Sequence, residues 1–69
     1  MKLFELARYR RTDGAGLRRL VVEVIAARNG GEATSEAYRR TNDLARDEVA
    51  VLTDSGADQV WTREGRTAA

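Results

Sequence analysis

The sequence contains neither cysteine nor histidine among its 69 residues. The absence of cysteine excludes disulfide bonds and thiolate chemistry. The absence of histidine removes the side chain that most often binds metals or acts as a general base. Carboxylates would therefore have to supply the protein ligands of any metal centre.

Long apolar runs are also missing. No apolar stretch approaches the roughly 18 residues of a membrane span. The first five residues, Met-Lys-Leu-Phe-Glu, lack the basic-then-apolar order of a signal peptide. We therefore expect a soluble, cytoplasmic protein.

The chain is short enough to form one domain. We expect residues 1–65 to form this domain and residues 66–69 to be a frayed polar tail. A chain of this length buries only roughly 60% of the surface that it exposes when unfolded, so its own stability should be marginal. Association with a partner chain would add to that stability.

The clearest local pattern predicts a β-hairpin. Residues 4–11 alternate between apolar and polar side chains at their start, and the loop at residues 12–16 holds an Asp-Gly pair and a second glycine. These loop residues readily adopt the positive φ angles of tight hairpin turns. A register with Arg11 opposite Leu17 brings apolar residues together on one face: Leu6 with Val22, and Phe4 with Val24. The same register sets Glu5 against Glu23, which is unfavourable.

The most apolar run, at residues 20–27, admits two interpretations. Leu17, Leu20, Val21, Val24 and Ile25 recur at helical spacing, and Asn29-Gly30 would end such a helix. We favour a strand because four of the eight residues in the run are β-branched.

A helix is predicted after this run. Thr34 or Ser35 can cap it, Glu36 begins it, and its apolar face continues to an end near residues 54–56. A short strand is then predicted over residues 58–63. The sequence thus predicts an α+β fold in the order ββαβ, with the helix packed on one face of a small sheet.

Both faces of the strand at residues 20–27 require cover. Leu20, Val22, Val24 and Ala26 occupy one face, and the residues between them occupy the other. One helix covers only one face of a small sheet, so we expect another chain, as a homodimer partner or in a larger assembly, to bury the second. The predicted interface residues are Leu3, Ala7, Val21 and Ile25.

Arginines gather near the predicted hairpin loop. Residues 1–31 carry a net charge of +4, and the remaining residues carry −3. The hairpin brings five arginines together around Tyr9, as candidate contacts for an anion or nucleic acid: Arg8, Arg10, Arg11, Arg18 and Arg19.

No pattern supports catalysis. Two sets of carboxylates could act as acid and base or bind a hard cation: Asp43, Asp47 and Asp54, or Glu32 and Glu36. Neighbouring arginines favour surface ion pairs instead. The glycines match no phosphate-binding motif. We therefore assign no catalytic residue, metal ligand or cofactor and expect no small-molecule substrate.

One family resemblance depends on the helical interpretation of residues 17–28. Asn29-Gly30, followed by Ser35-Glu36-Ala37-Tyr38-Arg39-Arg40, resembles the helix-turn-helix half of ribbon-helix-helix repressors over about 30 residues. The resemblance implies a dimer whose β-ribbon reads the DNA major groove. The favoured function is a non-enzymatic protein-interaction module, and a repressor or antitoxin of this DNA-binding type is the alternative.

Overall fold

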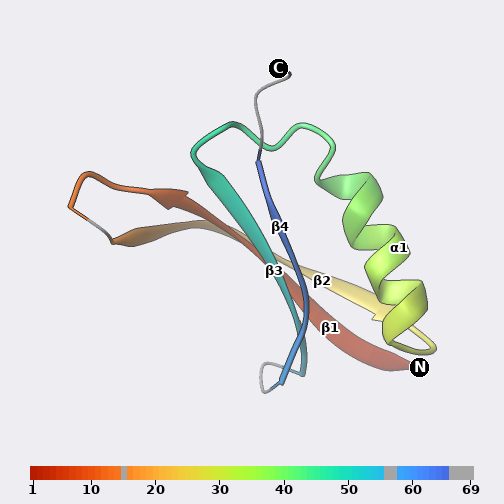
Figure 1. Ribbon diagram of the computed structural model, residues 1–69. Coiled ribbons are helices and arrows are strands. Elements are labelled where there is room, and N and C mark those ends of the chain that lie inside the picture. The colour runs from red at the N-terminus through yellow and green to blue at the C-terminus, as the bar shows by residue number, and fades with distance from the viewer. Residues whose placement is uncertain (15, 56–57, 66–69) are drawn as a thin grey trace.

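Two β-hairpins flank a single helix in the computed structural model, which describes residues 1–14, 16–55 and 58–65. The first hairpin consists of β1 (Lys2–Arg11) and β2 (Leu17–Ala27). The helix α1 (Gly30–Arg40) follows, and the second hairpin consists of β3 (Glu48–Asp54) and β4 (Asp58–Glu64). All four strands pair antiparallel in one sheet, in the order β2-β1-β3-β4 (Figure 1).

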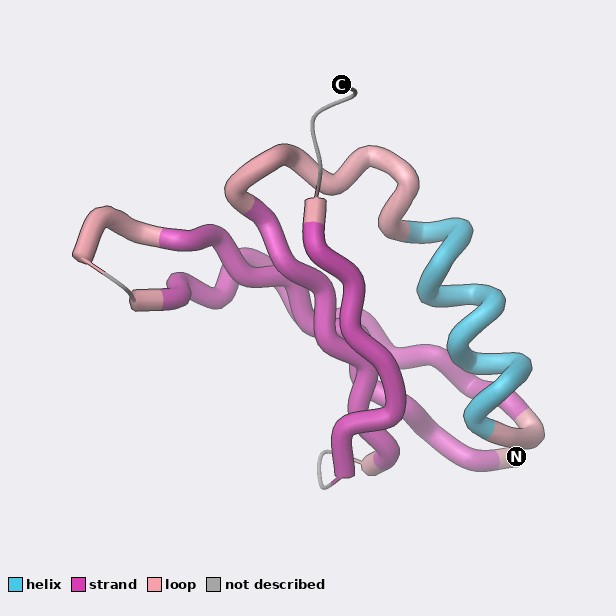
Figure 2. Tube along the Cα trace, viewed as in Figure 1, coloured by secondary structure: helices cyan, strands magenta, loops and turns pink. Residues whose placement is uncertain are grey.

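The helix lies against one face of the sheet, and the turn between β1 and β2 projects from the sheet on the side away from the helix (Figure 2). We call the covered face the helix-side face and the other the open face. Side chains alternate between the two faces along each strand. The core lies between α1 and the helix-side face and contains Phe4, Leu6, Ile25, Ala27, Ala33, Ala37, Ala50 and Leu52.

The first hairpin has the predicted turn but a different register over most of its length. Arg11 lies opposite Leu17 as predicted, and Gly14 has a φ of 92° in the turn. The register then shifts by one residue between Arg8 and Tyr9. Such a bulge places one extra residue on one strand and exchanges the faces of all residues beyond it.

The shift changes the predicted pairs. Phe4 lies opposite Ile25 rather than Val24, and Leu6 lies opposite Glu23 rather than Val22. Glu5 now faces Val24, so the bulge separates the two glutamates that the uniform register would set against each other.

The helix begins earlier than predicted. Its cap is Asn29, whose side-chain Oδ1 accepts a hydrogen bond of 2.9 Å from the backbone N–H of Glu32. Glu32 in turn accepts from the backbone N–H of Arg28 at 3.2 Å. These two bonds satisfy the N–H of Glu32 in the first turn and the N–H of Arg28 just before the cap. The predicted start at Glu36, with Thr34 or Ser35 as cap, is wrong.

The helix also ends earlier than predicted, at Arg40, and residues 48–54 form β3 instead of its last turns. β3 lies inside the sheet between β1 and β4. Its two faces carry apolar residues, Ala50 and Leu52 towards the helix and Val49 and Val51 on the open side. A strand that is buried on both faces carries apolar residues at consecutive positions. It therefore lacks the alternation of apolar and polar residues by which a strand is recognised in a sequence.

The α+β class with one helix and a sheet is confirmed, and the order is ββαββ rather than ββαβ. The strand predicted at residues 58–63 is present as β4. Residues 17–27 form a strand, so the first helix that the ribbon-helix-helix resemblance requires is not formed there. The tail predicted at residues 66–69 lies outside the described residues. Within the described ranges, the helix is too short to cross a membrane.

Candidate functional site

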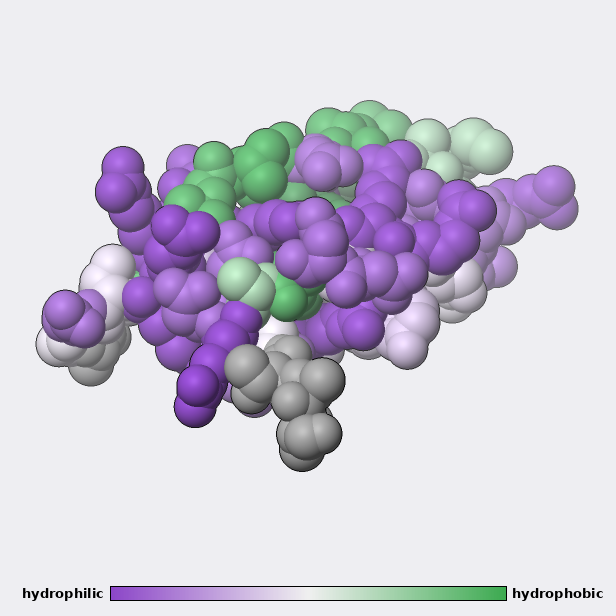
Figure 3. Space-filling view, turned by 90° about the horizontal axis from the view of Figure 1, so that it is seen from above, coloured by the Kyte–Doolittle hydropathy of each residue, from purple (hydrophilic) through white to green (hydrophobic). Residues whose placement is uncertain are grey.

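The open face presents exposed apolar side chains on β1 and β2. Leu3 is 57% exposed, and Val22 and Val24 are 39% and 61% exposed. Leu3 lies opposite Ala26 in the ladder, and Val22 lies opposite Ala7, so these residues form one continuous surface. We call Leu3, Ala7, Val22, Val24 and Ala26 the apolar patch. Figure 3 shows apolar residues gathered in a band along one long side of the molecule.

The apolar patch continues onto β3. Ala7, at its centre, pairs with Val22 on one side and with Val51 on the other. Glu5 is the charged residue within this area, because it shares the open face with Leu3 and Ala7. An ion pair between Arg11 and Glu64 lies at the hairpin end of the same face. The open face is therefore mainly apolar around Glu5 and charged towards the hairpin end.

The structure corrects the predicted interface. Leu3 and Ala7 lie on the open face, where Leu3 is exposed and Ala7, between β2 and β3, is only 9% exposed. Ile25 is only 2% exposed in the core, and Val21, opposite Arg8, lies on the helix-side face. Both residues were assigned to the wrong face, because the uniform register takes no account of the bulge. Val22 and Val24 replace them on the open face.

The predicted arginine cluster is divided between the two faces. Arg10 lies opposite Arg18 on the helix side, whereas Arg19 lies opposite Tyr9 on the open side. Arg10 forms ion pairs with Asp47 at 3.5 Å and with Glu48 at 3.4 Å. Within the described ranges, Arg18 and Arg19 are the two members of the predicted cluster that form no ion pair.

Arg8 connects β1 to the end of the helix. Its Nη2 donates to Asp43 Oδ1 at 2.6 Å and to the backbone oxygen of Arg40 at 2.7 Å. The hydrogen bond from Arg8 lowers the pKa of the Asp43 carboxyl, and the same bond raises the pKa of the guanidinium. Arg8 therefore stabilises the helix end, where unpaired carbonyls carry partial negative charge.

A second group of charges connects β2 to α1. Arg40 donates from Nη1 to Glu23 at 3.0 Å and from Nε to Glu36 at 2.8 Å. Bonds from Arg40 and then from Arg39 lower the pKa of Glu36, and the bond to Glu36 raises the pKa of Arg40. These contacts hold the helix on the sheet. The charged residues of this group bond one another, so no bound ligand is needed to explain them.

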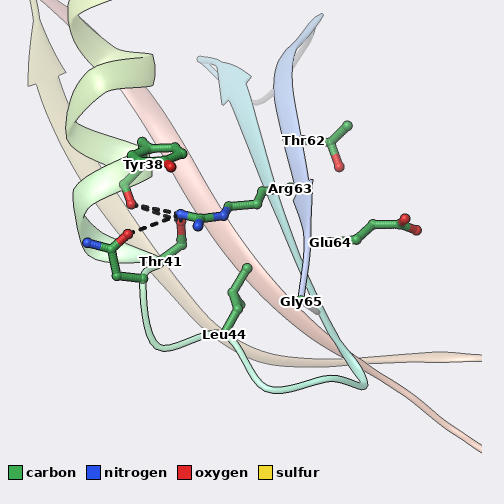
Figure 4. A pocket seen from close by; sticks show the side chains of 8 residues that line it. Tyr38, Thr41, Leu44, Thr62, Arg63, Glu64 and Gly65 are labelled. Atoms are coloured by element: carbon green, nitrogen blue, oxygen red, sulfur yellow. Dashed lines mark hydrogen bonds between the residues drawn. The ribbon is translucent and has the colours of Figure 1, made fainter. Parts of the chain in front are cut away.

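A shallow groove of about 610 Å³ lies between the end of α1 and β4. Arg63 reaches across it, and its Nη1 donates to Tyr38 O at 3.1 Å, Thr41 Oγ1 at 3.2 Å and Asn42 Oδ1 at 3.3 Å (Figure 4). Its guanidinium carbon also lies 4.2 Å from the centre of the Tyr38 ring. At this groove, Arg63 of β4 thus bonds the end of the helix. These polar groups of the groove already bond one another.

The acidic residues do not converge on a metal site. No group of three or more carboxylates in the described ranges is arranged to hold an ion. Asp43 bonds Arg8, and Asp47 pairs with Arg10. The apolar patch is therefore the surface whose composition most needs an explanation.

Comparison with models of known protein families, with curated proteins and with solved structures finds no match to this chain.

Proposed function

We propose that this chain is a non-enzymatic interaction module that forms a homodimer by packing the apolar patches of two copies against each other. The observation that carries the proposal is the exposure of Leu3, Val22 and Val24 side by side on the face without a helix. Contiguous exposed apolar surface is uncommon on monomers and typical of interaction sites. Burial of this surface would also add stability that a short chain lacks.

The shape of the molecule suits face-to-face packing. Its extents are 38 × 25 × 15 Å, so the molecule is broad and thin, as a sheet covered by one helix is. Two sheets pack closely when their inner faces carry interdigitating apolar side chains.

A second copy is the occupant that fits best. A two-fold axis brings a surface against itself, so residues near the axis meet copies of themselves or of their neighbours. Valine, leucine and alanine tolerate this arrangement, whereas a cluster of one charge would repel its copy. The five residues of the apolar patch have the former composition, and Glu5 is a single charge among them rather than a cluster.

Two adjacent valines provide a matched test. Val22 and Val21 have similar exposure, 39% and 43%, but lie on opposite faces. We expect Val22→Lys to convert the dimer into a folded monomer and Val21→Lys to leave the dimer intact. Sedimentation velocity measures the mass of each variant, and circular dichroism verifies that each is folded.

The proposal fails if both variants have the same effect on assembly. It also fails if the wild-type chain is monomeric at about 0.1 mM, where a dimer of micromolar affinity would be almost fully formed.

A further inference from the structure

The outer edge of β2 carries backbone groups that no described strand occupies. β2 is the terminal strand of the sheet, next to β1. Leu3 O accepts from Ser55 N, and Arg11 N donates to Asp47 O, so the odd-numbered residues of β1 direct their backbone groups towards the second hairpin. The even-numbered residues of β1 consequently face β2.

This alternation fixes the direction of each amide in β2. Phe4 and Leu6 face β2, so their partners Ile25 and Glu23 exchange hydrogen bonds with β1. Val22 and Val24 lie between these positions and direct their N–H and C=O groups to the free edge. Their side chains lie on the open face, so both the backbone and the side chains of this segment are accessible.

The edge of β2 is unprotected in comparison with the opposite edge. β2 has 11 residues, and its segment 20–26 has one charged residue, Glu23, which is held on the helix side by Arg40. β4 has only seven residues and carries charged residues at both ends. β2 also has a register shift, at Leu20, but the shift leaves residues 21–27 as a regular stretch. Short and charged edges resist the addition of a strand, whereas long apolar edges favour it.

The two ends of β2 differ in charge. Arg18 and Arg19 follow Leu17 at the start of the strand and form no ion pair within the described ranges. Arg28, which follows the strand, has Glu32 within 3.9 Å. Among the residues that the structure describes, positive charge without a local partner on β2 therefore lies at the start of the strand.

We propose that the free edge of β2 binds an extended segment of a partner protein as a fifth, antiparallel strand. An antiparallel segment places its C-terminal end beside Arg18 and Arg19. These arginines point to opposite faces, as do consecutive residues of an added strand. The segment that fits has β-branched residues along its length and two consecutive acidic residues at its C-terminal end.

This inference does not depend on the proposed homodimer. Face-to-face packing covers side chains of the open face, whereas strand addition uses backbone groups in the plane of the sheet. The two surfaces can therefore be occupied together, and each can fail without the other.

A synthetic peptide serves as the probe. It has ten residues, alternates valine with threonine and ends in two aspartates. Its control has the same composition with the aspartates at the N-terminal end. We expect the amides of Val22 and Val24 to gain protection from hydrogen exchange when the probe is added. The control should bind roughly fivefold more weakly, as expected for two surface ion pairs.

Substitution of Val24 separates backbone from side-chain effects. Val24→Pro removes an N–H that points outwards and breaks no hydrogen bond to β1, whereas Val24→Thr retains that N–H. We expect the proline variant to fold and to lose the probe, and the threonine variant to bind it. If the proline variant does not fold, a probe N-methylated at the positions that face β2 should fail to bind the wild-type chain.

Three results would overturn the proposal. The first is the absence of new exchange protection at Val22 and Val24 with the probe. The second is equal binding of the plain and N-methylated probes. The third is protection of the amides of residues 22 and 24 that rises with protein concentration, without the probe, in Val22→Lys. Face-to-face packing is lost in this variant, so such protection would show that a second copy of β2 occupies the edge.

Discussion

Phe4 lies opposite Ile25 in the first hairpin, and both side chains are buried beneath the helix, with exposures of 1% and 2%. This pair determines which residues of β2 point inwards. Because side chains alternate, the placement of Ile25 in the core directs Val24 and Val22 to the open face. The bulge near Arg8 is thus the reason that the exposed apolar surface consists of these valines.

Truncation of Ile25 and of Val24 should have very different costs. Ile25→Ala leaves a cavity in the core, and we expect the free energy of unfolding to fall by about 2–5 kcal/mol. Val24→Ala at an exposed position should change the stability of the monomer by about 0.5 kcal/mol or less. Urea denaturation at low protein concentration measures both. Equal losses would contradict the assignment of faces.

Gly65 should not tolerate a larger residue. A Cβ atom at this position would lie 1.8 Å from the backbone oxygen of Ala45 and 3.2 Å from that of Glu48. The end of β4 is fixed there, because Gly65 N donates to Glu48 O at 2.8 Å. We expect Gly65→Ala to destabilise the fold by about 1–3 kcal/mol, as overpacking does elsewhere. Gly14→Ala, where no atom lies within 4 Å, is the comparison, since its cost of about 1 kcal/mol comes from the backbone angle alone.

Arg63 should stabilise the helix end. Its side chain bonds three oxygens from the end of α1 and the following residues and lies over Tyr38. Arg63→Met retains much of the aliphatic chain but loses these bonds, and we expect a loss of about 1–2 kcal/mol in urea denaturation. Arg46→Met is the control, because Arg46 forms no ion pair in the described ranges. A loss of equal size at Arg46 would contradict this role.

Acid should weaken the contacts between the helix and the sheet. The pKa values of Glu36 and Asp43 are lowered in the folded state, by bonds from Arg40 and Arg39 and from Arg8. A carboxyl with a lowered folded-state pKa stabilises the fold above its unfolded-state pKa, near 4, and this stabilisation is lost as the pH falls through the folded-state value. We expect the urea midpoint to fall as the pH decreases below about 4.

Neutral replacements test the source of this pH dependence. The double substitution Glu36→Gln and Asp43→Asn should lower the midpoint at neutral pH and reduce its fall in acid. Glu5→Gln, which removes a carboxylate without an ion pair in the described ranges, should leave the profile nearly unchanged. An unchanged profile in the double variant would contradict the account.

The first hairpin could be predicted from sequence because its signals are local. The Asp13-Gly14 turn fixes the pairing of Arg11 with Leu17. The bulge could not be predicted, because it depends on which face of β2 the helix covers. The clash between Glu5 and Glu23 in a uniform register was the sequence signal that pointed to it.

The helix boundaries were missed for a different reason. Asn29 followed by Glu32 is a capping pattern, but Asn29-Gly30 also suits the end of a helix, so the local signal was ambiguous. The apolar spacing through Val49 and Leu52 continued the helical pattern into a segment that is a strand between two others. Tertiary packing decided both cases.

The sequence predicts that the sheet has an open apolar face, but it identifies only some of the residues on that face. A two-sided apolar strand with one covering helix implies an open apolar face, and Leu3 and Ala7 lie on it. Because of the one-residue shift, Val22 and Val24 lie on the open face in place of Val21 and Ile25. The arginines were predicted to lie near one another, but three of them pair with acidic residues from β3, β4 and the segment between α1 and β3.

The mass of the wild-type chain in solution tests the central proposal most directly. Sedimentation velocity over a range of concentrations, together with Val22→Lys and Val21→Lys, measures whether copies associate through the open face. We predict a species of twice the monomer mass of 7.7 kDa that is lost in Val22→Lys and retained in Val21→Lys. A wild-type chain that stays monomeric at about 0.1 mM would contradict the proposal.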